Sequence, residues 1–169
     1  MMPTETSYAL AGDATSAKAV RRIFKTKGRK ETKSLPLIVD SLAMAKRYAN
    51  FQAVECALAK RYWPGPLTLV LKKRRGTRLA SGVVAKDGTV ALRVSSHPTA
   101  RAISRSLRHP LISTSANRAG EPPLFSAMNI PFAVDAVMDV GRLPMRKPST
   151  IVRVKDREVE VLREGAVRL

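Results

Sequence analysis

The stretch Thr89-Val90-Ala91-Leu92-Arg93-Val94 predicts a buried strand and begins the segment that decides the fold class. Residues His97–Arg108 follow, with apolar side chains at helical spacing that include Leu107 on the expected inner face. Leu111-Ile112-Ser113 is then a second apolar run of strand length. Strand, helix and strand in close succession are typical of an α/β domain.

The same alternation extends outward in both directions. Asp13 or Thr15 offers an N-cap for the first helix, and Gly28 ends it. The proline at position 36 favours an edge or strand-start position for its run. The predicted helices are 15–26, 42–49 and 51–62, the strands are 35–39 and 67–71, and a hairpin spans 151–162. With no repeats and no linker rich in Gly or Ser, residues 1–169 form one predicted domain.

The composition indicates a polyanionic partner. There are 31 Lys and Arg against 13 Asp and Glu, a net charge of +18, which attracts RNA or nucleotides whatever the fold. A hydrophobic content of 44% excludes the disordered class, and no apolar run reaches the roughly 20 residues of a membrane span. Cys56, His97 and His109 cannot form a structural zinc site. The N-terminus has no secretion signal, so we expect a cytoplasmic protein.

Polar residues gather where predicted elements end. Lys27-Gly28-Arg29 lets the chain turn and directs two cations toward one anion. Ser113–Asn117 brings three hydroxyls and an amide into one turn, which suits phosphate or carboxylate oxygens, although an ordinary Asx or Ser turn explains it as well. Arg93, charged within an apolar strand, must be paired, at a strand end or facing an anionic ligand. The chain offers neither a Ser/His/Asp triad nor a Walker phosphate loop.

Seven motifs in a fixed order carry a resemblance to a known family. They are Pro3–Tyr8, Lys27–Arg29, Trp63–Thr68, Val90–Val94 with His97-Pro98, Ser113–Asn117, Pro148–Val152 and Leu162–Ala166. The ordered set resembles the YrdC/TsaC family of threonylcarbamoyl-AMP synthases, in the short form without an additional C-terminal domain. The resemblance implies an α/β fold with a twisted mixed sheet flanked by helices around a basic cavity.

The resemblance also implies a reaction and its partners. L-Threonine, bicarbonate and ATP give threonylcarbamoyl-AMP and pyrophosphate, with Mg²⁺ carried by ATP and no metal site on the protein. The product supplies the downstream transfer machinery for t6A modification of tRNA. Binding of tRNA or double-stranded RNA is a further expectation, and a non-catalytic RNA-binding protein of the same fold is the alternative function, because the high positive charge suits either.

The site residues that the resemblance implies fall into three groups. Lys27, Arg29, Ser115 and Asn117 match the catalytic quartet that handles the phosphates and the adenylate. Arg29, Lys33, Thr89, Ser115 and Arg163 match ATP-binding positions. Thr6, Arg93, Ser113 and Ser149 match positions that hold L-threonine, with Arg93 as the partner of its carboxylate.

The chain also departs from the family pattern. Ala9 replaces a glycine, Lys30 replaces a proline, and Asp40 stands where many relatives have a histidine near threonine. Asp40 would either repel the threonine carboxylate or pair with its amine. The resemblance implies a helix and a strand before the Pro3 motif, which begins two residues after the start, so we expect a domain truncated at its N-terminus relative to the family. We therefore expect an exposed sheet edge and lower stability, unless another segment covers that edge.

Overall fold

The computed structural model describes residues 1–28 and 33–169. Within them the chain forms a mixed eight-stranded sheet in the order β1-β2-β6-β3-β5-β4-β7-β8. The strands are β1 (Met2–Pro3), β2 (Tyr8–Asp13), β3 (Leu37–Val39), β4 (Leu67–Lys72), β5 (Thr89–Val94), β6 (Leu111–Ser115), β7 (Thr150–Lys155) and β8 (Glu158–Arg163). The helices are α1 (Ala17–Lys27), α2 (Leu42–Tyr48), α3 (Ala53–Tyr62) and α4 (Pro98–Leu107). The predicted α/β class is confirmed.

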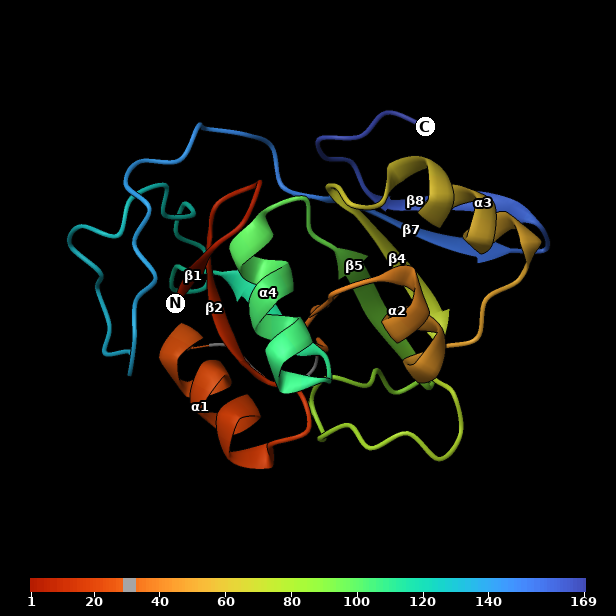
Figure 1. Ribbon diagram of the computed structural model, residues 1–169, viewed down its shortest axis with the longest axis horizontal. Helices are drawn as coiled ribbons and strands as arrows, with labels where there is room; N and C mark the ends of the chain where they lie inside the picture. Colours follow the sequence, from red (N-terminus) through yellow and green to blue (C-terminus); the bar gives the residue numbers. More distant parts are fainter. Residues whose placement is uncertain (29–32) are drawn as a thin grey trace.

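Two parallel pairs sit within an otherwise antiparallel sheet. β3 runs parallel to β5, and β4 runs parallel to β7. In register, Ile38 lies opposite Arg93 on one side and opposite Leu111 on the other, so β3 is a central strand. Pro36 directly precedes this strand, and the strand-start position expected for it is confirmed, whereas the edge position is wrong. At the far end of the sheet from the N-terminus, β7 and β8 form the predicted hairpin (Figure 1).

The main core comes from alternate residues of the central strands. Leu37, Leu69, Leu92 and Ile112 are all at most 1% exposed and pack with apolar side chains of α1, α2 and α3. A smaller cluster joins Ile38 and Leu111 to α4 and β1. Because successive side chains of a strand point to opposite faces, α4 covers the face of β3 and β6 that lies opposite the main core. Arg93 shares this α4 face through its register with Ile38.

A long segment without helix or strand connects β6 to β7. Its apolar residues, which include Leu124, Phe132 and Leu143, pack against Tyr8 and Leu10 of β2. The Tyr8 hydroxyl lies 2.9 Å from Oδ1 of Asp139 and 2.8 Å from the Gly141 carbonyl oxygen. Figure 1 shows this segment beside the N-terminal end of the chain before it crosses toward β7. These contacts hold a 34-residue connection, 116–149, against the sheet.

The same segment meets the sheet edge at β1. Met2 and Pro3 pair with Ala9 and Tyr8, and the backbone of Met1 exchanges hydrogen bonds with Ala136 and Met138. Part of the outer edge of β2 is therefore covered. The sequence allowed for this outcome as the alternative to an exposed sheet edge. No helix in the described ranges is long and apolar enough to span a bilayer.

Two local expectations are corrected. The N-cap of α1 is Ser16, not Asp13 or Thr15. Asp13 still belongs to β2, and its carboxylate accepts a hydrogen bond from the backbone N–H of Thr15. Leu107 is 38% exposed. The buried positions of α4 are Ala100 and Ser104, so the inner face of the helix passes through Ser104 and not through Leu107. The Ser104 hydroxyl donates to the carbonyl of His109.

Candidate active site

The end of α1 is joined to the end of β6 by a buried lysine. Lys27 is 4% exposed, and its ammonium donates to the Ser115 carbonyl at 2.7 Å, the Asn117 carbonyl at 3.0 Å and Asn117 Oδ1 at 2.8 Å. The Ser115 hydroxyl donates to the same Oδ1 at 2.6 Å. Gly28 then turns the chain with φ 60°. Three of the four predicted catalytic residues are thus in direct contact, while Arg29 lies outside the described residues.

Three hydrogen bonds of Lys27 are directed at the turn 115–117 and fix the position of Ser115 and Asn117. Its catalytic assignment stays a prediction. Asn117 Nδ2 also bonds the carbonyl of Glu121, which ties the turn to the chain that follows. The turn is held from both sides.

A buried ion pair forms on the α4 face of the sheet. Arg93 Nη1 lies 2.7 Å from Oε1 of Glu5, and the two side chains are 9% and 6% exposed. Ser95 donates its hydroxyl to the other oxygen of Glu5. Burial lowers the pKa of Arg93, and the Glu5 carboxylate opposes this shift. Of the alternatives left open for Arg93, two are observed: it is paired with Glu5, and it is the penultimate residue of β5.

A second polar chain lies where β7 begins. The Thr68 hydroxyl donates to Ser149 Oγ at 2.9 Å, and Arg163 Nη2 reaches the same oxygen at 3.0 Å. Arg163 also grips the Ser149 carbonyl through Nε at 3.1 Å and Nη2 at 2.6 Å. Burial lowers the pKa of Arg163, and repulsion from the Arg93 guanidinium lowers it further, so the two cations lie close enough to interact.

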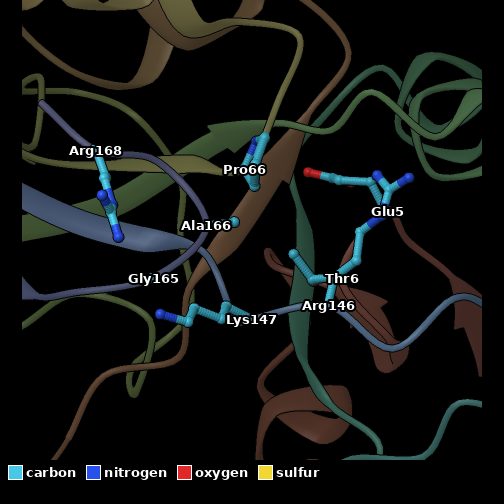
Figure 2. A pocket seen from close by; sticks show the side chains of 8 residues that line it. All are labelled: Glu5, Thr6, Pro66, Arg146, Lys147, Gly165, Ala166 and Arg168. Atoms are coloured by element: carbon cyan, nitrogen blue, oxygen red, sulfur yellow. The ribbon is translucent and has the colours of Figure 1, made fainter.

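A cavity of about 430 Å³ opens beside these groups. Its lining residues are Glu5, Thr6, Pro66, Arg146, Lys147, Gly165, Ala166 and Arg168. Figure 2 shows Lys147 and Arg168 on the side of the Gly165–Ala166 backbone, and Glu5 and Thr6 on the other side. Three of the eight side chains are cationic and one is a carboxylate, so the cavity suits an anionic or zwitterionic ligand.

The contacts described above do not include the remaining predicted site residues. Ser113 is buried on β6, two residues before Ser115. Lys33 is exposed in the chain before β3. Thr89 lies at the start of β5 and bonds the Asp87 carboxylate at 2.6 Å, about 13 Å along the strand from Arg93. The structure therefore does not bring Thr89 to the cavity, and its assignment to ATP stays a prediction.

The sequence analysis missed several residues of this region. Glu5 and Ser95 complete the environment of Arg93, and Arg146, Lys147 and Arg168 line the cavity. Glu5 had a signal, because it stands inside the Pro3–Tyr8 motif. The three cations had none, since each is one of 31 basic residues.

Comparisons with known proteins identify the family of the chain. The family model Sua5_yciO_yrdC, described as "Telomere recombination", matches residues 1–165. The chain belongs to the Sua5/YciO/YrdC family. A Thiobacillus denitrificans member named threonylcarbamoyl-AMP synthase is 37% identical over 160 residues, which cover 89% of this chain and 81% of that protein.

Solved Sua5/YciO/YrdC structures share the fold. Pyrococcus abyssi Sua5 complexed with L-threonine superposes with a TM-score of 0.87 and 32% identity, covering 97% of this chain. The chain spans about half the length of that Sua5, 49%. E. coli YciO gives a TM-score of 0.82 at 28% identity, with 97% of this chain and 81% of YciO covered. The family expected from the sequence motifs is confirmed.

Proposed function

We propose that this protein is a threonylcarbamoyl-AMP synthase. The observation that carries the proposal is the pairing of two features on one sheet: the Lys27-fixed turn with Ser115 and Asn117, and the cation-lined cavity beside Arg93. Family membership and relatives named for this activity support the same conclusion. ATP and L-threonine are then the substrates, with bicarbonate as the source of the carbamoyl carbon.

The reaction needs positioned charge more than a protein nucleophile. Bicarbonate loses hydroxide to give carbon dioxide, and the neutral threonine amine adds to its carbon and releases a proton. An oxygen of the resulting carbamate then attacks the α-phosphorus of ATP. A new O–P bond forms while the bond to the departing pyrophosphate breaks, and negative charge builds on the oxygens that leave. Fixed cations and hydrogen-bond donors stabilise that charge without reorganising, which accounts for most of the rate in such transfers.

The described side chains divide this work between them. When ATP binds, the Ser115 hydroxyl turns from Asn117 Oδ1 to a phosphate oxygen, and Asn117 Nδ2 donates through its second N–H. Arg29 supplies the charge that follows Lys27 in the sequence. Arg93 takes the threonine carboxylate, since a guanidinium binds a carboxylate through two parallel hydrogen bonds. Arg163 holds Ser149, which lies two residues after Lys147 of the cavity lining. Thr6 and Ser149 then face the substrate side chain.

We propose that Mg²⁺ arrives as a complex with ATP. Within residues 1–28 and 33–169, no group of three or more His, Cys, Asp and Glu side chains is placed to hold a metal ion. Glu5 is one carboxylate among the described residues that line the cavity, too few protein ligands to hold Mg²⁺ by itself. The oxygen donors for the ion therefore come from the triphosphate and water, as is usual for nucleotide-bound Mg²⁺. The product would pass to the t6A transfer machinery.

Pyrophosphate release tests the proposal. Purified protein is incubated with ATP, Mg²⁺, bicarbonate and L-threonine, and each component is omitted in turn. We expect release only with all four, and a loss of about 10²-fold or more in Arg29→Ala, because removal of one fixed charge donor has that effect in comparable sites. Lys25→Ala, exposed on α1, is the matched control and retains activity. Folded protein that binds RNA but releases no pyrophosphate would support the non-catalytic alternative instead.

A further inference from the structure

Glu5 lines the cavity, but the proposed reaction assigns it no role in binding the substrate. It is the one acidic residue among the eight described residues that line the cavity, beside Arg146, Lys147 and Arg168. Its carboxylate is fixed by Arg93 at 2.7 Å and by the Ser95 hydroxyl. A buried carboxylate with a defined position and a cavity-facing side is a binding group for a cation.

We propose that Glu5 binds the α-ammonium group of the amino-acid substrate and thereby makes the site selective for an α-amino acid over the corresponding acid without the amine. The inference rests on the proposed function, because it assigns a new contact to the same substrate. Glu5 is a binding residue here, and Arg93 remains the partner of the substrate carboxylate.

The Glu5–Arg93 pair has the polarity that a zwitterion requires. An α-amino acid carries an ammonium and a carboxylate on one carbon, and the pair offers a carboxylate and a guanidinium whose nearest atoms are 2.7 Å apart. Within the described part of the chain, the Arg93 guanidinium donates one hydrogen bond, to Glu5, so most of its five N–H donors remain for a second carboxylate. Each Glu5 oxygen likewise has a lone pair beyond the one already used.

The cations around the cavity repel the substrate ammonium, so a carboxylate is needed to bind it. Arg146, Lys147 and Arg168 attract phosphate and carboxylate groups but repel an ammonium. Glu5 offsets this repulsion; Figure 2 places it away from Lys147 and Arg168, while the Arg146 side chain extends to the same side of the view as Glu5. Once the amine has become a carbamate, it has lost its positive charge, so the contact holds the amino acid and not the intermediate.

Asp40, the acidic residue that the sequence offered for the amine, is engaged elsewhere. Its carboxylate accepts from the Ser41 hydroxyl at 2.6 Å and lies 3.5 Å from Arg105 of α4. It is not among the residues that line the cavity. The structure therefore favours Glu5 over Asp40 as the partner of the ammonium.

A binding cycle isolates the contact. L-Threonine and (R)-3-hydroxybutanoate, which is threonine without its amine, are titrated by calorimetry into wild-type protein and Glu5→Gln in bicarbonate-free buffer. We expect wild type to bind threonine roughly 10- to 100-fold more tightly than the analogue, the range for a hydrogen-bonded charge pair. In Glu5→Gln this ratio falls below about threefold. Glutamine keeps an oxygen acceptor for Arg93, so binding of the analogue changes little.

Ser95→Ala is the matched control. It removes the second hydrogen bond to Glu5 but leaves the carboxylate, so the ratio stays near that of wild type. Equal losses in Ser95→Ala and Glu5→Gln would mean that Glu5 only positions Arg93, and would overturn the proposal. Wild-type protein that binds the analogue as tightly as threonine, or binds neither, overturns it without any variant. A Glu5-dependent ratio in protein that releases no pyrophosphate would refute the proposed function alone.

Discussion

Replacement of Lys27 by Met removes the link between α1 and the turn 115–117. Methionine has a similar length and a similar helix propensity, so the change acts mainly on the ammonium, including its three hydrogen bonds to the turn 115–117. We expect the protein to fold with lower stability and to lose most of its pyrophosphate release. The measurement is a thermal melt by circular dichroism together with the activity assay.

The size of the loss in stability follows from the hydrogen bonds that each acceptor oxygen keeps when the ammonium is removed. The Ser115 carbonyl still accepts from the Asn117 amide at 3.0 Å, and Asn117 Oδ1 still accepts from the Ser115 hydroxyl. The Asn117 carbonyl is affected most, because leaving a buried acceptor without a hydrogen-bond partner destabilises the fold by about 1–3 kcal/mol. Two further charge-assisted bonds are worth ~1.5–3 kcal/mol each, offset by the several kcal/mol that burial of an ammonium costs. The net loss is about 2–4 kcal/mol.

This loss has a measurable size in Tm. A domain of this length shifts by about 2–4 °C per kcal/mol, so Lys27→Met should melt roughly 5–15 °C below wild type. Lys25→Met is the control, because Lys25 also lies in the last turn of α1 but is exposed. If both variants melt within about 2 °C of each other, the turn is held by something other than Lys27 and the estimate above is refuted.

Three further changes test other parts of the structure. Tyr8→Phe removes the hydroxyl that binds Asp139 and Gly141, so cleavage by a protease within 118–149 should accelerate while the melting temperature falls by only a few degrees; unchanged cleavage would contradict the anchoring. Burial, opposed by the charge of Glu5, lowers the pKa of His97 below its ordinary value of about 6.5. The folded chain then resists a proton that the unfolded chain accepts, so stability is present above pH 6.5 and declines as the pH falls below it. His97→Asn keeps an N-cap that does not titrate and should reduce the difference in Tm between about pH 7.5 and 5.5; an equal difference speaks against His97 as its source. Arg22→Ala breaks an exposed ion pair with Asp135 and should change stability by less than about 0.5 kcal/mol in chemical denaturation.

The sequence by itself determined the fold class and the family. Periodicity placed the central strands and all four helices close to their observed ranges, because burial of alternate residues or of one helical face leaves a pattern along the chain. The motifs that follow these elements identified Lys27, Ser115 and Asn117 as a group, and the structure joins them through direct hydrogen bonds.

Only the tertiary structure decided what these polar groups contact. Arg93 and Glu5 are 88 positions apart, and Arg163 and Ser149 meet because the β7–β8 hairpin folds back on itself. The periodicity of a sequence shows on which face of its helix or strand a side chain lies. The partner of an ion pair depends instead on which distant loops the order of the strands brings together. For the same reason the sequence left open whether Asp40 repels the threonine carboxylate or pairs with its amine, while the fold places Asp40 beside Arg105 and Glu5 at the cavity.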